Sequence, residues 1–309
     1  EVVDTITEDE LDPDGIGQLA LARGLLLYGS GKTSASLNVV HSALERLGKL
    51  GMANLVMAQL EAGLGNIYCT LGDYETALTC HEKAFRMASR LGNDVLMRGV
   101  GGNLVLCCNR LGKYDDQAAW LKQLPPAKSA DFSVIVEMQL AFLTALGHLH
   151  AGRVDLADEA VATLDRKLGI GTPRWAAQSW AFRKADLLWL TGRRAEALRV
   201  AGEELNTSSR TLLSLGLAGP FARWIALTSR GCLHVDESRS ILEPLTTTLG
   251  QYDAVDQAEI LLSLCIIEER KLDWDVASRD KPLKETLLKL PHTVRSQLAL
   301  LADMPRLAV

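Results

Sequence analysis

The sequence predicts an all-α protein built as a stack of helical hairpins, and three observations lead to this class. Four glycines, Gly72, Gly112, Gly152 and Gly192, follow one another at intervals of 40 residues. The segments between them carry apolar residues at spacings of three and four, the periodicity of a helix buried on one face. Aromatic residues make up only 5% of the chain against 48% hydrophobic residues, which favours Ala- and Leu-rich packing between helices.

Each of the four glycines follows the end of a helical pattern and precedes a polar residue, as in Leu71-Gly72-Asp73-Tyr74. Glycine suits a helix C-terminus because the residue there often adopts a left-handed conformation that penalises a Cβ atom. A second helical pattern follows at once, so the repeating unit is a hairpin. Small residues allow its two helices to approach closely, and we expect Gly65 to face Ala77 and Ala84.

The same pattern, a turn between two helical segments, predicts about seven hairpins and a last helix after Pro291. We expect them to form a single domain over residues 15–309. The first hairpin covers about Ile16 to Leu47, and the seventh covers about Tyr252 to Leu290. The expected turns lie near Gly29 to Lys32, at Gly72, Gly112, Gly152, Gly192 and Gly231, and around Leu272 to Asp275. Neighbouring hairpins must stack because one hairpin cannot bury its own apolar face. Residues 1–14 are interpreted as an acidic lead-in, with disorder as one alternative.

The bulk properties argue against several partner classes. A net charge of −5 with scattered arginines predicts neither direct nucleic-acid binding nor attraction to an anionic membrane. No uninterrupted apolar run reaches about 18 residues and no signal peptide opens the sequence, so we expect a cytoplasmic protein. The first residue is Glu1, which leaves open that the sequence is a piece of a longer protein.

The second hairpin resembles the tetratricopeptide repeat. Leu64-Gly65-x-x-Tyr68, Gly72-x-Tyr74, Ala77 and Ala84 fall at the spacings of that family, whereas Glu61, His81 and Ser89 depart from its signature. The period of 40 exceeds the usual repeat of about 34 residues, which predicts longer helices or longer turns between hairpins. The resemblance implies a right-handed α-solenoid.

The segment Tyr74 to Ala84 is also similar to the helical arrays of bacterial signalling and transcriptional regulators. That resemblance implies a non-catalytic, protein- or peptide-binding scaffold that serves as the sensor region of a larger regulator. A constitutive adaptor that holds a protein partner in an assembly is the alternative. Other domains of the same full-length chain are further candidate partners.

The sequence contains no convincing motif for chemistry, so we expect no catalytic residue, cofactor or metal. Gly29-Ser30-Gly31-Lys32-Thr33 lacks the first glycine of a phosphate-binding loop and follows a helical pattern, which favours a turn with Thr33 or Ser34 capping the next helix. His148 and His150 are two residues apart and point to different helix faces. We expect His81 to be a packed residue with a satisfied nitrogen. The six cysteines show no Cys-x-x-Cys pair and are expected to be reduced core residues.

In tetratricopeptide arrays the first helix of each hairpin lines a concave groove that binds the partner. The corresponding positions of this sequence are found by counting back from each turn glycine, and we expect the polar, charged and aromatic residues among them to line the groove. The predicted groove residues are Gln59, Asn66, Asn103, Asn109, Arg110, Gln139, Phe142, Arg183, Asp186, Trp189 and Phe221. The asparagines suit the backbone of an extended peptide because an amide both donates and accepts hydrogen bonds. The arginines suit a carboxylate, and the aromatic residues suit apolar side chains, with packing between hairpins as their alternative.

Overall fold

The structure is a computed structural model, and it describes residues 11–52, 54–126, 134–168, 173–205, 218–229, 235–267 and 281–302. Within these residues the regular structure is α-helical apart from one short 3-10 turn, and no strand occurs, which confirms the all-α prediction. The chain divides into two compact units, Glu1–Phe132 (unit 1) and Ser133–Val309 (unit 2). None of the described helices is long and apolar enough to cross a membrane. The single domain over residues 15–309 stays a prediction.

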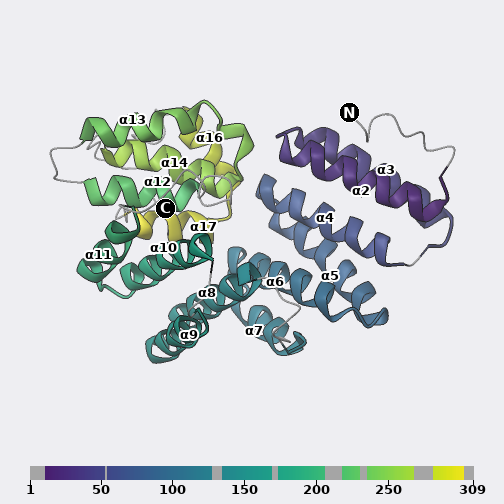
Figure 1. Cartoon of the computed structure of the whole chain (residues 1–309), viewed down its shortest axis with the longest axis horizontal. Coiled ribbons are helices and arrows are strands. Elements are labelled where there is room, and N and C mark those ends of the chain that lie inside the picture. Colours follow the sequence, from purple (N-terminus) through teal and green to yellow (C-terminus); the bar gives the residue numbers. More distant parts are fainter. Residues whose placement is uncertain are drawn as a thin grey trace. The chain divides into compact units, whose positions relative to one another are not determined.

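Unit 1 contains three consecutive helical hairpins. They are formed by α2 (Pro13–Gly29) with α3 (Thr33–Lys49), by α4 (Leu55–Leu71) with α5 (Tyr74–Arg90), and by α6 (Asp94–Arg110) with α7 (Tyr114–Gln123). Each helix packs on the next one along the chain, and α4 also contacts the first helices of both neighbouring hairpins, α2 and α6 (Figure 1). Contact between successive hairpins is the packing of a helical repeat.

The 40-residue period of the turn glycines comes from the length of the helices. α5 and α6 have 17 residues each, and a turn of three residues follows each of them. From Tyr74 to Arg194 a new helix begins at every twentieth residue, so one hairpin with its two turns takes 40 residues. Longer helices therefore explain the long period.

The turn glycines adopt the left-handed conformation that the sequence predicts. Gly72 has a φ of 80°, and its N–H donates to the carbonyl of Cys69 while the N–H of Asp73 donates to the carbonyl of Tyr68, each over 3.0 Å. This pair of hydrogen bonds is a Schellman motif, which satisfies carbonyls left over at the helix end. The same conformation occurs at Gly112, Gly152 and Gly192, at Gly31 within the first predicted turn, and at Gly51 and Gly92, which lie outside the predicted turns.

Two local expectations in unit 1 are wrong. α3 begins after Lys32 without a side-chain cap, so neither Thr33 nor Ser34 caps it, because Lys32 occupies the capping position. The lead-in ends before residue 14, because α2 starts at Pro13 and Asp12 caps it; residues 1–10 lie outside the described residues. At Gly65, a Cβ atom would lie 2.6 Å from the ring of His81, so the nearest neighbour of Gly65 is that ring, which lies on the same buried face of α5 as Ala77 and Ala84.

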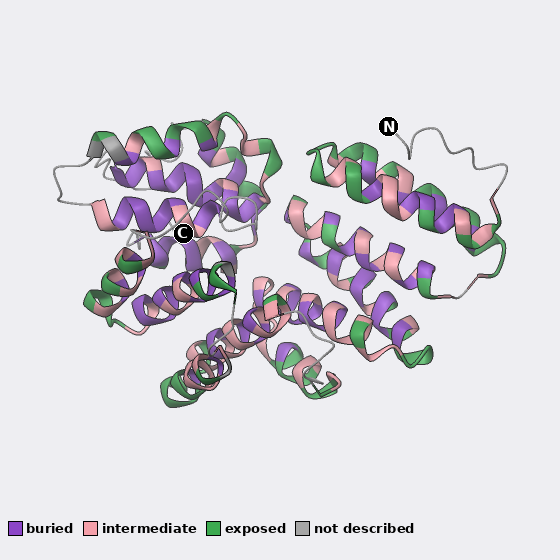
Figure 2. Ribbon diagram, viewed as in Figure 1, coloured by how far each residue is buried: buried purple, intermediate pink, exposed green. Residues whose placement is uncertain are grey.

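Leucine, valine and alanine side chains form the core of unit 1 between its helices. Leu47, Leu60 and Leu64 lie in one cluster, and Ala84, Phe85 and Leu104 lie in the next. Figure 2 shows buried positions following the sides of the helices that face a neighbour, while exposed positions cover the opposite sides. Each helix therefore stabilises two neighbours through one apolar stripe.

Unit 2 also consists of helices in its described residues, and these begin at less regular intervals along the sequence. Its first two hairpins are α8 (Val134–His150) with α9 (Val154–Lys167) and α10 (Arg174–Leu190) with α11 (Arg194–Leu205). The further helices are α12 (Ala218–Ser229), α13 (Val235–Thr246), α14 (Ala254–Ile267), α16 (Lys281–Lys289) and α17 (His292–Leu301), with a 3-10 turn at Leu249–Gln251. The turns expected at Gly231 and around Leu272 to Asp275 lie outside the described residues.

The last described helix of unit 2 packs on a helix far earlier in the chain. α17 contacts α10, and Leu301 lies in the same apolar cluster as Phe182, Trp189 and Trp224. A helical repeat with contacts only between neighbours would leave the last helix against the preceding hairpin. The helix expected after Pro291 is therefore present, and it closes the core of unit 2.

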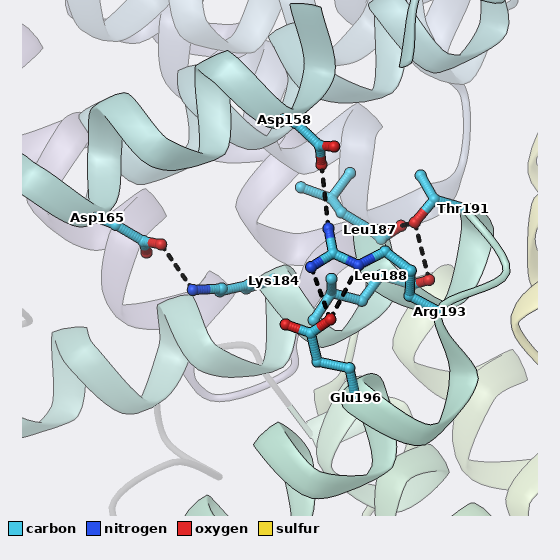
Figure 3. Close-up of polar contacts among 8 residues, drawn as sticks. All are labelled: Asp158, Asp165, Lys184, Leu187, Leu188, Thr191, Arg193 and Glu196. Atoms are coloured by element: carbon cyan, nitrogen blue, oxygen red, sulfur yellow. Dashed lines mark hydrogen bonds and ion pairs between the residues drawn. The ribbon is translucent and has the colours of Figure 1, made fainter. Parts of the chain in front are cut away.

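Charged side chains join α9, α10 and α11. Arg193 lies between Asp158 of α9 and Glu196 of α11, at 3.4 Å and 2.6 Å, while Lys184 of α10 pairs with Asp165 of α9 at 2.6 Å (Figure 3). These contacts are partly exposed, so each contributes at most about 1 kcal/mol to stability. Together they fix how α10 and its turn lie against the preceding hairpin.

Candidate functional site

The first helices of the second and third hairpins are joined by an asparagine pair. Nδ2 of Asn103 on α6 donates a hydrogen bond of 2.8 Å to Oδ1 of Asn66 on α4. Asn66 is exposed and Asn103 is half-buried. The hydrogen bond holds both amides in place and leaves Nδ2 of Asn66 and Oδ1 of Asn103 available as donor and acceptor.

A small apolar pocket adjoins Asn66. Its volume is about 40 Å³, and Asn66 and Gly63 of α4 line it together with Leu21, Leu25 and Tyr28 of α2. Leu25 is 58% exposed, so the pocket lies at the surface of unit 1. Its size exceeds the roughly 10–15 Å³ that a single water needs, which suits a small apolar side chain.

The polar contacts continue from α4 to the first hairpin. Tyr28 Oη on α2 and Thr70 Oγ1 on α4 are 2.5 Å apart, and Thr70 Oγ1 also donates to the carbonyl of Asn66. Tyr28, Thr70, Asn66 and Asn103 thus form a connected line across the three first helices of unit 1, and we call these four residues the amide row. Gln59 lies half-buried two turns before Asn66 on the same helix, and Arg110 lies half-buried at the end of α6.

One predicted groove residue of unit 1 is an interior residue. Asn109 is only 3% exposed, and its Nδ2 donates to Oε1 of Gln117 on α7 over 3.3 Å. Its side chain therefore faces the second helix of its own hairpin. The prediction that Asn109 contacts a partner is therefore wrong, because its side-chain amide is buried and already hydrogen-bonded to Gln117.

In unit 2, Phe142 and Arg183 form a contact between first helices. The guanidinium of Arg183 on α10 lies 5.1 Å from the ring centre of Phe142 on α8, within the range of a cation–π interaction. Both residues are half-buried, as is Gln139 one turn earlier on α8. Phe221 of α12 is half-buried and meets the edge of Phe182, with ring centres 6.4 Å apart.

Two further predicted groove residues, Asp186 and Trp189, are interior residues. Trp189 is 8% exposed, its ring packs edge-on against Trp224, and its Nε1 donates to the carbonyl of Leu300 over 3.2 Å. Asp186 is 4% exposed and accepts hydrogen bonds of 2.8 Å from Arg223 and from Trp224 Nε1. Neither side chain can contact a partner here, because both are buried in the interior of unit 2. Their predicted place in the groove is therefore wrong.

Arg223 connects three first helices in the interior of unit 2. It reaches Asp186 of α10 at 2.8 Å and Glu259 of α14 at 3.2 Å, and all three side chains are buried. Burial raises the pKa of Asp186, while the charge of Arg223 opposes that rise. Gly219 allows α12 to approach α14 closely, because a Cβ atom there would lie 2.4 Å from the Glu259 carboxylate. The arrangement is a structural anchor.

Two cysteines and a histidine that are far apart in the sequence meet in unit 1. Cys69 of α4, His81 of α5 and Cys107 of α6 each offer a ligand atom, and these atoms all lie within 4.8 Å of one another. The contact with the Cys69 thiol and burial raise the pKa of the Cys107 thiol. The expectation of a satisfied His81 nitrogen is wrong for Nδ1, which is buried and has no hydrogen-bond partner within the described residues. His81 follows Cys69 by 12 residues and Cys107 follows His81 by 26, so the three residues form no short sequence motif.

The Gly29-to-Thr33 segment joins two helices. Gly31 has a φ of 74° in the turn between α2 and α3, and its N–H donates to the carbonyl of Tyr28. A phosphate-binding loop joins a strand to a helix. The prediction of a hairpin turn is therefore confirmed.

Comparison of the sequence with models of protein families and with curated proteins gives no match. The function of the chain must therefore be inferred from its own residues.

Proposed function

We propose that this chain is a non-catalytic scaffold that binds an extended peptide segment of a protein partner along the first helices of its hairpins. The observation that carries the proposal is the Asn66–Asn103 pair, which joins α4 and α6 by a 2.8 Å hydrogen bond on the accessible side of unit 1. A hydrogen-bonded pair is already ordered, so a peptide that binds it loses less side-chain entropy on binding.

The chemistry of the pair fits a peptide backbone. An extended peptide presents an N–H and a C=O at each residue, and the pair offers one free acceptor on Asn103 and one free donor group on Asn66. The 40 Å³ pocket next to Asn66 would receive a small apolar side chain of the same peptide. Amide contacts to the backbone supply affinity, and the pocket supplies specificity.

Unit 2 offers a second surface of different chemistry. The Arg183 guanidinium lies against the face of Phe142, which orients its donors. An arginine held in this way suits an acidic side chain or a terminal carboxylate, because the planar guanidinium can pair with both oxygens. The partner of unit 2 would therefore carry an acidic group beside an apolar one.

The biological setting that we propose is the sensor region of a larger bacterial signalling or transcriptional regulator. The tetratricopeptide-like residues of the second hairpin and the 40-residue period support this setting. Filling the groove would change the packing between hairpins and pass that change to a neighbouring domain. A constitutive adaptor would bind its partner with no such change.

Photo-crosslinking tests where a peptide binds. Unstructured peptides would be selected from a random library on the full chain, and a photoreactive amino acid would replace Asn103, Phe142 or, as a control, the exposed Asn38 of α3. We expect crosslinks from residue 103 or 142 and none from residue 38. Crosslinks from residue 38 alone would place the binding surface on the second helices and refute the proposal.

Solution scattering separates the sensor from the adaptor. The scattering curve of the full chain would be recorded with and without a saturating selected peptide. A peptide-dependent change in the radius of gyration supports the sensor. An unchanged curve at full occupancy supports the adaptor.

A further inference from the structure

Three consecutive helices bring Cys69, His81 and Cys107 together. Cys69 lies in the last turn of the first helix of the second hairpin, His81 lies on the second helix of that hairpin, and Cys107 lies on the first helix of the third. Sγ of Cys69 is 3.5 Å from Sγ of Cys107 and 3.9 Å from Nε2 of His81. Cys69 is half-buried, whereas His81 and Cys107 are fully buried.

The local packing makes room for the imidazole and leaves it poorly bonded. His81 is 0% exposed, and the three nearest ring atoms would lie only 2.6–2.7 Å from a Cβ atom on Gly65. A glycine at this place in α4 is therefore what admits the ring. Nδ1 of His81 has no hydrogen-bond partner within the described residues, and Nε2 has only the long contact to sulfur. Burying an imidazole so weakly bonded is costly unless something else binds it.

Two of the three distances between the ligand atoms match the edges of a metal coordination sphere, and the third pair of atoms lies within 4.8 Å. Zn²⁺ binds cysteine sulfur at about 2.3 Å and histidine nitrogen at about 2.0 Å in a tetrahedral arrangement. Two such sulfurs lie about 3.8 Å apart, and a sulfur and a nitrogen lie about 3.5 Å apart. The observed 3.5 Å and 3.9 Å differ from these values by a few tenths of an ångström. A disulfide would instead need the sulfurs at about 2.05 Å.

We propose that Cys69, His81 and Cys107 form a binding site for a thiophilic divalent metal ion of the Zn²⁺ class. On binding, both thiols release their protons to solvent and the neutral imidazole donates its lone pair, so two thiolates balance the charge of the ion. Three protein ligands leave a fourth position for water or another exchangeable ligand. The ion would join α4, α5 and α6, and thus the second hairpin to the third.

The position of the cluster connects it to the amide row. Cys69 follows Asn66 by three residues on α4, and Cys107 follows Asn103 by four residues on α6. Each cysteine therefore lies about one helical turn beyond the asparagine of its helix. An ion at the cluster would fix the spacing of α4 and α6 where the asparagine pair bridges them. The metal site does not depend on peptide binding and is tested without a peptide.

The wild-type chain provides the first test. The untagged full chain, kept reduced, would be titrated with Co²⁺ and then with Zn²⁺ in competition with a chromophoric chelator. We expect one ion per chain, a thiolate-to-Co²⁺ charge-transfer absorption that Zn²⁺ abolishes, release of two protons per ion, and a higher melting temperature with Zn²⁺. Absence of the charge-transfer absorption at saturating Co²⁺ would overturn the proposal without any variant.

Single substitutions locate the ion. Cys69→Ser, Cys107→Ser and His81→Gln should each weaken Zn²⁺ binding by more than the roughly 10–100-fold that loss of an outer-shell partner costs. Cys80→Ser and Cys108→Ser are matched controls, because both thiols are buried on the same helices α5 and α6 but lie outside the cluster. We expect these controls to bind Zn²⁺ like the wild type. Equal losses in the controls would place the ion elsewhere.

Folding and oxidation need separate readouts. Circular dichroism would establish that each variant keeps its helices, and Cys69→Ser decides the outcome if Cys107→Ser fails to fold, because Cys69 is only half-buried. Mass spectrometry of the air-exposed chain would detect a Cys69–Cys107 disulfide. A chain that forms this disulfide but binds no Zn²⁺ when reduced would overturn the metal site.

Discussion

Nε1 of Trp189 donates a hydrogen bond of 3.2 Å to the carbonyl of Leu300, although the two residues are 111 positions apart in the sequence. The bond joins α10 to α17 above a shared apolar cluster. α17 therefore belongs to the core of unit 2.

Two adjacent leucines of α17 test this role. Leu301 is 5% exposed and Leu300 is 53% exposed. We expect Leu301→Ala to lower the free energy of unfolding of unit 2 by about 2–5 kcal/mol, because it leaves a cavity. Leu300→Ala keeps the carbonyl that Trp189 binds and should change stability by less than about 0.5 kcal/mol. Tryptophan fluorescence during denaturant unfolding measures the stability of both variants. Similarly small losses of stability in the two variants would mean that α17 does not contribute to the core.

Two glycines of α4 should respond in opposite ways to alanine. At Gly65 a Cβ atom would meet the His81 ring at 2.6 Å, whereas at Gly63 the nearest atom, on Leu21, is 4.0 Å away. We expect Gly65→Ala to destabilise unit 1 by about 1–3 kcal/mol through overpacking. Gly63→Ala should stabilise it by up to about 1 kcal/mol, because alanine favours the helix. Thermal unfolding compares the two, and a stabilised Gly65→Ala variant would contradict the close packing of His81.

The buried carboxylate of Asp186 should matter far more than an exposed one. Asp186→Ala leaves Arg223 in the core without one of its two carboxylate partners, at a cost of about 3–5 kcal/mol. Glu203→Ala removes the exposed partner of Arg199 and should cost at most about 1 kcal/mol. Chemical denaturation distinguishes these outcomes. Equal effects would mean that the Arg223 network is not an anchor.

Stability should fall in mildly acidic solution because of His148. Burial, helped by the charge of Arg153 and opposed by Glu159, lowers the pKa of His148 below its ordinary value of 6.5. The folded protein thus favours the neutral ring, and the stability that this residue contributes is present above pH 6.5 and is lost as the pH falls toward the folded pKa. His148→Gln should therefore show a smaller drop in melting temperature between about pH 7.5 and 5.5 than the wild type. If the melting temperatures of the wild type and of His148→Gln fell equally with pH, protonation of His148 would not be the cause of the lost stability.

The hairpin fold could be predicted because it depends on local rules. The requirement for a left-handed residue at a helix end made Gly72, Gly112, Gly152 and Gly192 recognisable from the sequence. Gly51 and Gly92 adopt the same conformation, but they fall between the 40-residue steps and were not recognised. The return of α17 to α10 could not be predicted, because no local pattern encodes a contact across 111 residues.

The site could be predicted only in part. Asn66 and Asn103 were predicted from their positions before the turn glycines Gly72 and Gly112, and the structure brings the two asparagines into contact. Asn109 lies six residues after Asn103, which is about 240° around the helix, so both cannot face the same side. The burial of Asp186 depends on Arg223 and Glu259, which come from two later helices. The cluster of Cys69, His81 and Cys107 likewise arises only when three helices stack.

The measurement that tests the scaffold most directly is the affinity of a selected peptide for three proteins, by isothermal titration calorimetry. They are the wild type, the double variant Asn66→Ala/Asn103→Ala, and the control Asn38→Ala, which removes an exposed asparagine from the second helix α3. Loss of two amide hydrogen bonds, each contributing about 0.5–1.5 kcal/mol, should weaken binding by the double variant about 5- to 150-fold. The control should bind like the wild type, and circular dichroism should show all three proteins folded at the temperature of the titration. Unchanged affinity in the double variant, with folding intact, would contradict peptide binding at the amide row.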